Sequence, residues 1–170
     1  MKRLVLFITM FLWVLGVQAE GERTLVFKVD IKDEIGPEVW RLVKKSFEKA
    51  QEENATYILI DMNTYGGMVV YADSLRSLIL NSKIPVWVFI DNNAASAGAL
   101  ISIACDRIYM REGANIGAAT VVNQRGEAMP DKYQSYMRSM IRATAQAHGK
   151  DTLIEGRDTS YRWKRDPHIA

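Results

Sequence analysis

The chain has 170 residues, with 22 Lys or Arg against 20 Asp or Glu, so its formal net charge is only +2. This near balance, and the lack of a basic stripe with interleaved aromatics, argues against a nucleic-acid partner. A single cysteine, Cys105, excludes an internal disulfide. Because Cys105 stands in an apolar stretch, we expect it to pack as a small buried hydrophobe.

The first residues have the pattern of a secretory signal peptide. Lys2 and Arg3 precede an uncharged apolar run over 4–17, and Val17-Gln18-Ala19 offers small side chains where a signal peptidase reads them. We expect cleavage after Ala19, which removes two basic residues. The remaining residues, 20–170, form one domain with a formal net charge of zero. The run is short for a membrane-spanning helix, although a retained anchor is the alternative.

From Thr24 onward, strand-like and helix-like stretches alternate. Apolar and β-branched runs predict strands, and apolar residues at helical spacing predict helices. The expected strands are 25–29, 56–60, 85–90 and 107–110; the expected helices are 37–53, 68–81, 94–104 and 130–148, the last capped by Gly149. Residues 61–67 and 113–126 are expected to be a turn and a long loop. Apolar strands separated by helices predict an α/β fold, a parallel sheet covered by helices on both sides.

The sequence ends without a helix cap or a polar tail. Residues after Asp166-Pro167 read as the start of another helix, and the chain stops there. We therefore expect the C-terminal part of the domain to be missing from this sequence.

A glycine pair follows the second predicted strand. The segment Asn63-Thr64-Tyr65-Gly66-Gly67 lies directly before the helix that begins at Met68. Ligands of parallel sheets bind at the carboxyl ends of strands, where glycines expose backbone N–H groups and a helix start adds partial positive charge. These features suit an oxyanion hole that uses the Gly67 N–H, with Gly66 and Met68 beside the substrate. An ordinary strand–helix turn would explain the same residues.

A serine follows the next buried strand in a stretch of small residues, Asn93-Ala94-Ala95-Ser96-Ala97-Gly98-Ala99. Ser96 at such a turn can present its hydroxyl to a cleft, and small neighbours leave room for a substrate backbone. The Ala97 N–H can then point to the same place as that of Gly67. The alternative is that Ser96 is a helix N-cap, a position that serine favours.

Together, the Gly-Gly turn and the Ala-Ser-Ala-Gly turn about 30 residues later resemble the ClpP-class proteases. Within that class, residues 24–167 are most similar to the NfeD family of membrane-associated serine proteases, also called stomatin operon partner proteases. The resemblance implies a ClpP/crotonase-like fold, a Ser96 nucleophile and a Ser–Lys dyad.

The base that would activate Ser96 is sought first among the histidines. His148 and His168 lie far from the loop where a ClpP-type histidine is expected, which argues against a Ser-His-Asp triad. The only lysine between Ser96 and His148 is Lys132, expected at the edge of a buried helix face where a half-dry amine could act as base. Some family members carry the lysine later, near Arg142, and arginine cannot serve as a base.

The resemblance also implies substrates and partners. It suggests apolar peptide segments as substrates, a stomatin-like or prohibitin-like membrane protein as partner, and self-association. Met68, Val69 and Val122 could contact such substrates. The protein would lie in the periplasm or on the outer face of the cytoplasmic membrane, with any anchor beyond residue 170. No metal or nucleotide cofactor is expected.

Two other functions stay open. The same fold hosts crotonase-type acyl-CoA enzymes, but an export signal disfavours coenzyme A chemistry, which is intracellular. A non-catalytic module that binds or assembles a membrane protein is the second, because Arg142 departs from some family members.

Overall fold

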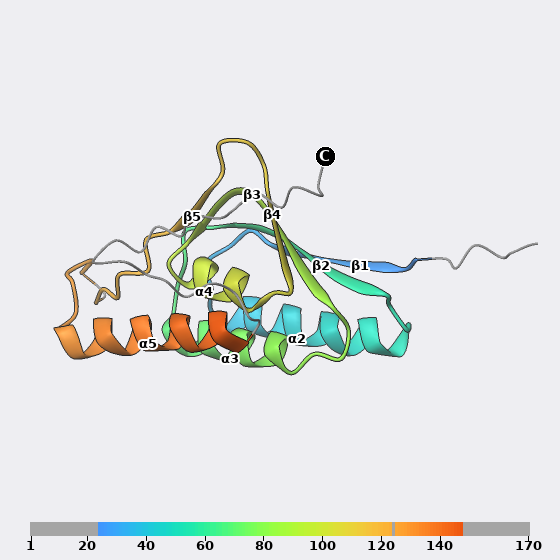
Figure 1. Ribbon diagram of the computed structural model, residues 1–170, viewed down its shortest axis with the longest axis horizontal. Coiled ribbons are helices and arrows are strands. Elements are labelled where there is room, and N and C mark those ends of the chain that lie inside the picture. Colours follow the sequence, from blue (N-terminus) through green and yellow to red (C-terminus); the bar gives the residue numbers. More distant parts are fainter. Residues whose placement is uncertain (1–23, 124, 148–170) are drawn as a thin grey trace, which may run out of the picture.

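The computed structural model describes residues 24–123 and 125–147 (Figure 1). The predicted leader at 1–19, His148, Gly149 and the C-terminal stretch with His168 lie outside these residues. In chain order the described elements are β1 (Val26–Ile31), α2 (Pro37–Glu52), β2 (Tyr57–Thr64), α3 (Val69–Leu80), β3 (Val86–Ala95), α4 (Ala97–Ala104), β4 (Arg107–Met110), β5 (Asn115–Gly117) and α5 (Asp131–Ala147).

The strands form one parallel sheet in the order β1-β2-β3-β4, and β5 pairs with the end of β3. The register places Val29 beside Ile60, Ile60 beside Val88 and Val88 beside Ile108. Partners in a parallel sheet point to the same face, so these residues form one apolar row. The predicted α/β class and parallel sheet are confirmed.

The two faces of the sheet differ. Burial alternates along β2 and along β3 as far as Ile90, so every second residue there is buried beneath the helices, all of which lie on one side of the sheet (Figure 1). The expectation of helices on both faces is therefore wrong for the described residues. On the other face of the sheet, which no described helix covers, aromatic side chains pack against one another. The Trp87 ring lies 4.1 Å from that of Tyr57 and 5.9 Å from that of Tyr109, and Arg107 lies over Trp87. We call this the open face.

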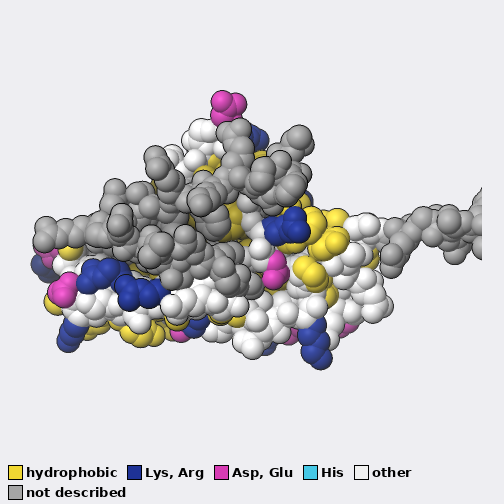
Figure 2. All heavy atoms as spheres, in the orientation of Figure 1, with side chains coloured by type: hydrophobic (Ala, Val, Ile, Leu, Met, Phe, Trp, Pro, Cys, Tyr) yellow, Lys and Arg dark blue, Asp and Glu magenta, His cyan; other side chains and the backbone are white. Residues whose placement is uncertain are grey.

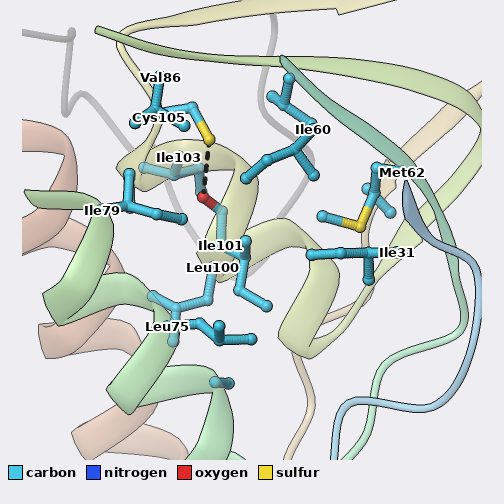
Figure 3. Packing of buried hydrophobic residues seen from close by; sticks show 14 of the residues in the cluster. Ile31, Ile60, Met62, Leu75, Ile79, Val86, Leu100, Ile101, Ile103 and Cys105 are labelled. Carbon is cyan, nitrogen blue, oxygen red and sulfur yellow. Dashed lines mark hydrogen bonds between the residues drawn. The ribbon is translucent and has the colours of Figure 1, made fainter. Parts of the chain in front are cut away.

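Helix α4 lies between the sheet and the outer layer of α2, α3 and α5 (Figure 1). All eight of its residues are buried, which its small and apolar composition allows. Cys105 follows α4 among apolar side chains, and its Sγ donates a hydrogen bond to the Ile101 carbonyl at 3.4 Å (Figure 3). The prediction that Cys105 is a packing residue is confirmed.

Three predicted boundaries are wrong. β2 continues to Thr64 and β3 to Ala95, although residues 61–67 were expected to be a turn and a helix was expected to begin at residue 94. Polar residues such as Asp61 and Asp91 interrupt the apolar runs, but they lie on the open face, where a strand tolerates them. The expected loop at 113–126 contains strand β5.

No helix within residues 24–123 and 125–147 combines the length and apolar character needed to cross a membrane.

Candidate active site

Ser96 occupies the junction between β3 and α4 in an unusual backbone conformation. Its φ is 52° and its ψ is −112°, a combination that L-residues rarely adopt. Although Ser96 stands at the N-cap position, its side chain makes no capping hydrogen bond, so the capping interpretation is wrong. A strained residue persists only where its surroundings impose the conformation, and such residues concentrate at functional sites.

The surroundings of Ser96 fix its backbone on both sides. Its N–H donates to the carbonyl of Gly117 in β5 at 2.7 Å. Its carbonyl accepts from the N–H groups of Ala99 and Leu100, at 3.1 and 3.4 Å, in the first turn of α4. Ser96 is half-buried, so its side chain is in part accessible. The short strand β5, which the sequence did not predict, therefore holds the serine in place.

The glycine turn after β2 lies directly against Ser96. A Cβ added to Gly66, whose φ is 114°, would lie 2.7 Å from the Cβ of Ser96. A Cβ added to Gly67, whose φ is 150°, would lie 2.3 Å from the carbonyl oxygen of Ile35. The turn is thus enclosed between Ser96 and the segment around Ile35, and only glycines fit there. The structure brings together the two features that the sequence singled out.

Two backbone donors at this junction are available. The Gly66 carbonyl and the Met68 N–H both bond to Ile35, so the extended geometry turns the Gly67 N–H away from Ile35. Ala97 is the first residue of α4, where N–H groups lack intrahelical acceptors. Neither the Gly67 nor the Ala97 N–H donates to an acceptor in the described part of the chain. Two such donors beside a serine could stabilise an oxyanion.

Lys132 is the second residue of α5, and its side chain is exposed. The ammonium lies 5.0 Å from the centroid of the Tyr133 ring and has no carboxylate partner among the described residues. The expected half-burial of this amine is wrong, because the buried face of α5 begins only at Met137. The described contacts include none between Lys132 and Ser96, and Arg142 is also exposed.

A cavity of about 340 Å³ adjoins the glycine turn and is lined by Lys32, Asp33, Glu34, Tyr65, Gly66 and Gly67. Sequence reasoning missed its acidic and basic residues, because the predicted first strand ended at residue 29 and 30–36 carried no motif. Of the expected substrate contacts, Met68 and Val122 are exposed, whereas Val69 is partly buried and packs against the core. In the described residues, no group of three or more His, Cys, Asp or Glu side chains is placed to hold a metal ion.

A charged network lies beside this cavity on the open face of the sheet. Asp61 forms ion pairs with Lys32 and with Lys28, the latter at 2.9 Å, while Lys32 also lies 3.9 Å from Asp91. Burial alone would raise the pKa of Asp61, but hydrogen bonds from Lys32 and Lys28 outweigh it and lower that pKa. Hydrogen bonds to Asp30 and then Asp61 raise the pKa of Lys28 above its ordinary range. The network fixes the end of β1 to β2 just before the glycine turn.

The sequence of residues 25–156 matches the NfeD1b N-terminal domain family. The chain belongs to this family. It is 33% identical over 140 residues to "Membrane protein NfeD1b" of Bacillus subtilis, a match that covers 81% of this chain and 32% of that protein. It is 29% identical over 140 residues to "Membrane-bound protease PH1510" of Pyrococcus horikoshii, covering 78% of this chain and 32% of that protein. The chain thus spans about a third of the length of these curated relatives.

Solved structures show that the NfeD1b-family chain has a ClpP-like fold. A lysine-to-alanine variant of the 1510-N membrane-bound stomatin-specific protease, in complex with a substrate peptide, matches with a TM-score of 0.73 and 28% identity over 78% of this chain and 64% of that one. ClpP1 from Listeria monocytogenes matches with a TM-score of 0.60 and 25% identity over 80% of both chains. The predicted family and fold are confirmed.

Proposed function

We propose that this chain is the protease domain of an exported, membrane-associated serine endopeptidase. The carrying observation is Ser96, held at a φ of 52° against Gly66 and beside two N–H groups that have no acceptor among the described residues. A half-exposed, strained serine beside two such N–H donors is an arrangement suited to acyl transfer. The names of two relatives, a membrane-bound protease and a stomatin-specific protease, support the same reaction class.

The proposed reaction proceeds through an acyl-enzyme. The Ser96 Oγ attacks the peptide carbonyl while the Lys132 Nζ takes the hydroxyl proton, and the Gly67 and Ala97 N–H groups bind the resulting oxyanion. Collapse of this intermediate breaks the C–N bond, and the leaving amine takes the proton from Lys132. Water then attacks the ester carbonyl while Lys132 accepts its proton. The ester C–O bond breaks, Lys132 returns the proton to the Ser96 Oγ, and the carboxylic acid is released.

Lys132 must be a neutral amine to act as base. In the described structure its side chain is exposed, and a peptide bound over the start of α5 would cover it. Solved 1510-N relatives carry alanine in place of a lysine or of a serine, which supports a serine and a lysine as the functional pair.

The proposed substrates are apolar peptide segments, with a stomatin-like membrane protein as partner. The exposed Met68 and Val122 offer apolar contacts, and a relative is named as stomatin-specific. A signal peptide at 1–19 would export the protease domain at 20–170 to the outer face of the cytoplasmic membrane. Self-association, which the family resemblance suggests, would complete the cleft.

Cleavage of an apolar peptide library tests this proposal. Ser96→Ala and Lys132→Ala should each abolish cleavage while the circular dichroism spectrum stays unchanged. Lys132→Arg keeps the positive charge but cannot provide a base, so it should be equally inactive. Lys45→Ala, which removes another exposed lysine without a carboxylate partner in the described residues, should cleave like the wild type. Activity retained in Lys132→Ala would move the base elsewhere.

One observation favours a second function, that of a non-catalytic binding module. Lys132 is exposed and makes no described contact with Ser96, as in a domain that binds peptides without cleaving them. Isothermal titration with an apolar peptide distinguishes the two functions. Binding without cleavage by the wild type, and equal binding by Ser96→Ala, would identify the binding module.

A further inference from the structure

Thr64, the last residue of β2, differs from the other buried polar residues. In the described part of the chain, the buried polar side chains are Thr64, Ser102 and Thr144. Ser102 donates to the Gly98 carbonyl and Thr144 to the Met140 carbonyl, each one turn back in its own helix. Such bonds are local and need no tertiary explanation. The Thr64 hydroxyl instead connects segments that are distant in sequence.

The hydroxyl joins the glycine turn to the segment before α2. Thr64 Oγ1 lies 2.7 Å from the Asp33 carbonyl oxygen and 3.3 Å from that of Gly66, and it accepts the Gly66 N–H at 3.1 Å. A hydroxyl has one hydrogen to donate, so the shorter contact, to Asp33, takes it. Oγ1 is therefore donor to one segment and acceptor from the other, and its rotation is fixed.

The methyl group of the same side chain reaches the other turn. A Cβ added to Gly98 would lie 2.8 Å from Thr64 Cγ2, so the methyl lies against the first turn of α4, two residues after Ser96. Thr64 is only 2% exposed and does not face the solvent. One side chain thus contacts both junctions that carry the proposed oxyanion donors.

We infer that Thr64 is a positioning residue that sets the spacing between the Gly67 and Ala97 N–H groups. Its hydroxyl fixes the glycine turn, and its methyl fixes the distance from that turn to α4. This inference rests on the proposed protease function. Oxyanion donors act only within a few tenths of an ångström of the right position, so a small shift lowers kcat with little effect on KM.

Two substitutions separate the parts of the side chain. Thr64→Val keeps the shape and removes the hydroxyl, and we expect kcat to fall at least about tenfold with KM nearly unchanged. Thr64→Ser keeps the hydroxyl but loses the methyl contact with α4, so its kcat should lie between those of the wild type and Thr64→Val. Thr144→Val is the matched control: it also removes a buried threonine hydroxyl, so it should lower the melting temperature while kcat is kept.

Thr144→Val and Thr64→Val could lose kcat equally at equal melting temperatures. That result would mean that Thr64 contributes only to stability, and it would overturn the inference. Wild-type kcat in Thr64→Val would also overturn it, because the hydroxyl would then be irrelevant.

Amide hydrogen exchange gives a readout that does not depend on cleavage. The Gly66 N–H should exchange faster in Thr64→Val than in wild type, Thr64→Ser or Thr144→Val, because only Thr64→Val lacks its acceptor. Absence of cleavage by the wild type would refute the proposed function, whereas unchanged exchange in Thr64→Val would refute the role of Thr64 in holding the turn.

Discussion

The turn after β2 and the turn after β3 both join a parallel strand to a helix, but they use different residues. The first is built on Gly66 and Gly67, whose positive φ values cost little. The second places Ser96 at a φ of 52°, where glycine would be less strained. The first turn therefore follows from close packing, whereas packing gives no reason for a serine in the second. That difference supports the proposed role of Ser96 as the nucleophile.

Replacing Gly67 with alanine is the strongest way to break the first turn. Its Cβ would meet the backbone of Ile35, which cannot move aside as a side chain can. We expect Gly67→Ala to lower the free energy of unfolding by about 3 kcal/mol or more, measured by urea denaturation. Gly36→Ala is the control, since its nearest new contact would be 3.9 Å away and its stability should change little. Wild-type stability in Gly67→Ala would show that the turn is loosely packed.

Replacing Ser96 with glycine sharpens the comparison in the opposite direction. Glycine adopts the Ser96 conformation without strain, so Ser96→Gly should raise the free energy of unfolding by about 1 kcal/mol while cleavage is lost. Ser96→Ala keeps the strained Cβ and should show no such gain. A Ser96→Gly protein no more stable than Ser96→Ala would mean that the backbone at this junction is not strained.

Removing the Asp61 carboxylate tests the support of the first turn more mildly. Asp61→Asn should lower the free energy of unfolding at pH 7 by about 1 kcal/mol, because Lys28 and Lys32 lose their shared partner. The folded-state pKa of Asp61 is lowered, so its stabilisation is complete above its ordinary pKa of 3.8 and is lost as the pH falls through the folded-state value.

Melting temperatures between pH 7 and pH 2 check this prediction. The difference between wild type and Asp61→Asn should be constant above about pH 5 and should disappear in acid. Asp73→Asn, which breaks an i,i+3 pair with Arg76 on a helix surface, should show a smaller difference above about pH 5. A difference that grows toward low pH would contradict the assigned sign.

Periodicity predicted the buried halves of β2 and β3 but not their ends. Asp61 and Asp91 lie on the open face and interrupt the apolar runs, so the strands were expected to stop at residues 60 and 90 rather than at Thr64 and Ala95. The short strand β5 has no pattern of its own, because it exists only through pairing with β3. Long-range pairing of this kind leaves little trace in local sequence.

The closeness of the two turns was predicted, but the surroundings of Lys132 and Thr64 were not. Gly66 and Ser96 lie side by side, as the positions of two turns at strand ends suggested. The exposure of Lys132 was not predicted. Helical spacing shows which face of α5 is apolar, but not at which residue α5 begins to pack against α4. The role of Thr64 depends on contacts with Asp33 and Gly98, which are far apart in sequence and cannot be read from spacing.

The complete burial of α4 affects how easily the two residues of the proposed dyad can move. Segments with many buried contacts open only with the cooperative unfolding of the whole domain, while exposed loops open locally at low free-energy cost. Ser96 directly precedes a helix whose every residue is buried, so we expect the proposed nucleophile to become mobile only when the core unfolds. Lys132 lies on an exposed helix start and does not share that protection. The two residues of the proposed dyad therefore differ in local stability. Ser96 is fixed by the core, whereas Lys132 can change its position when a substrate binds.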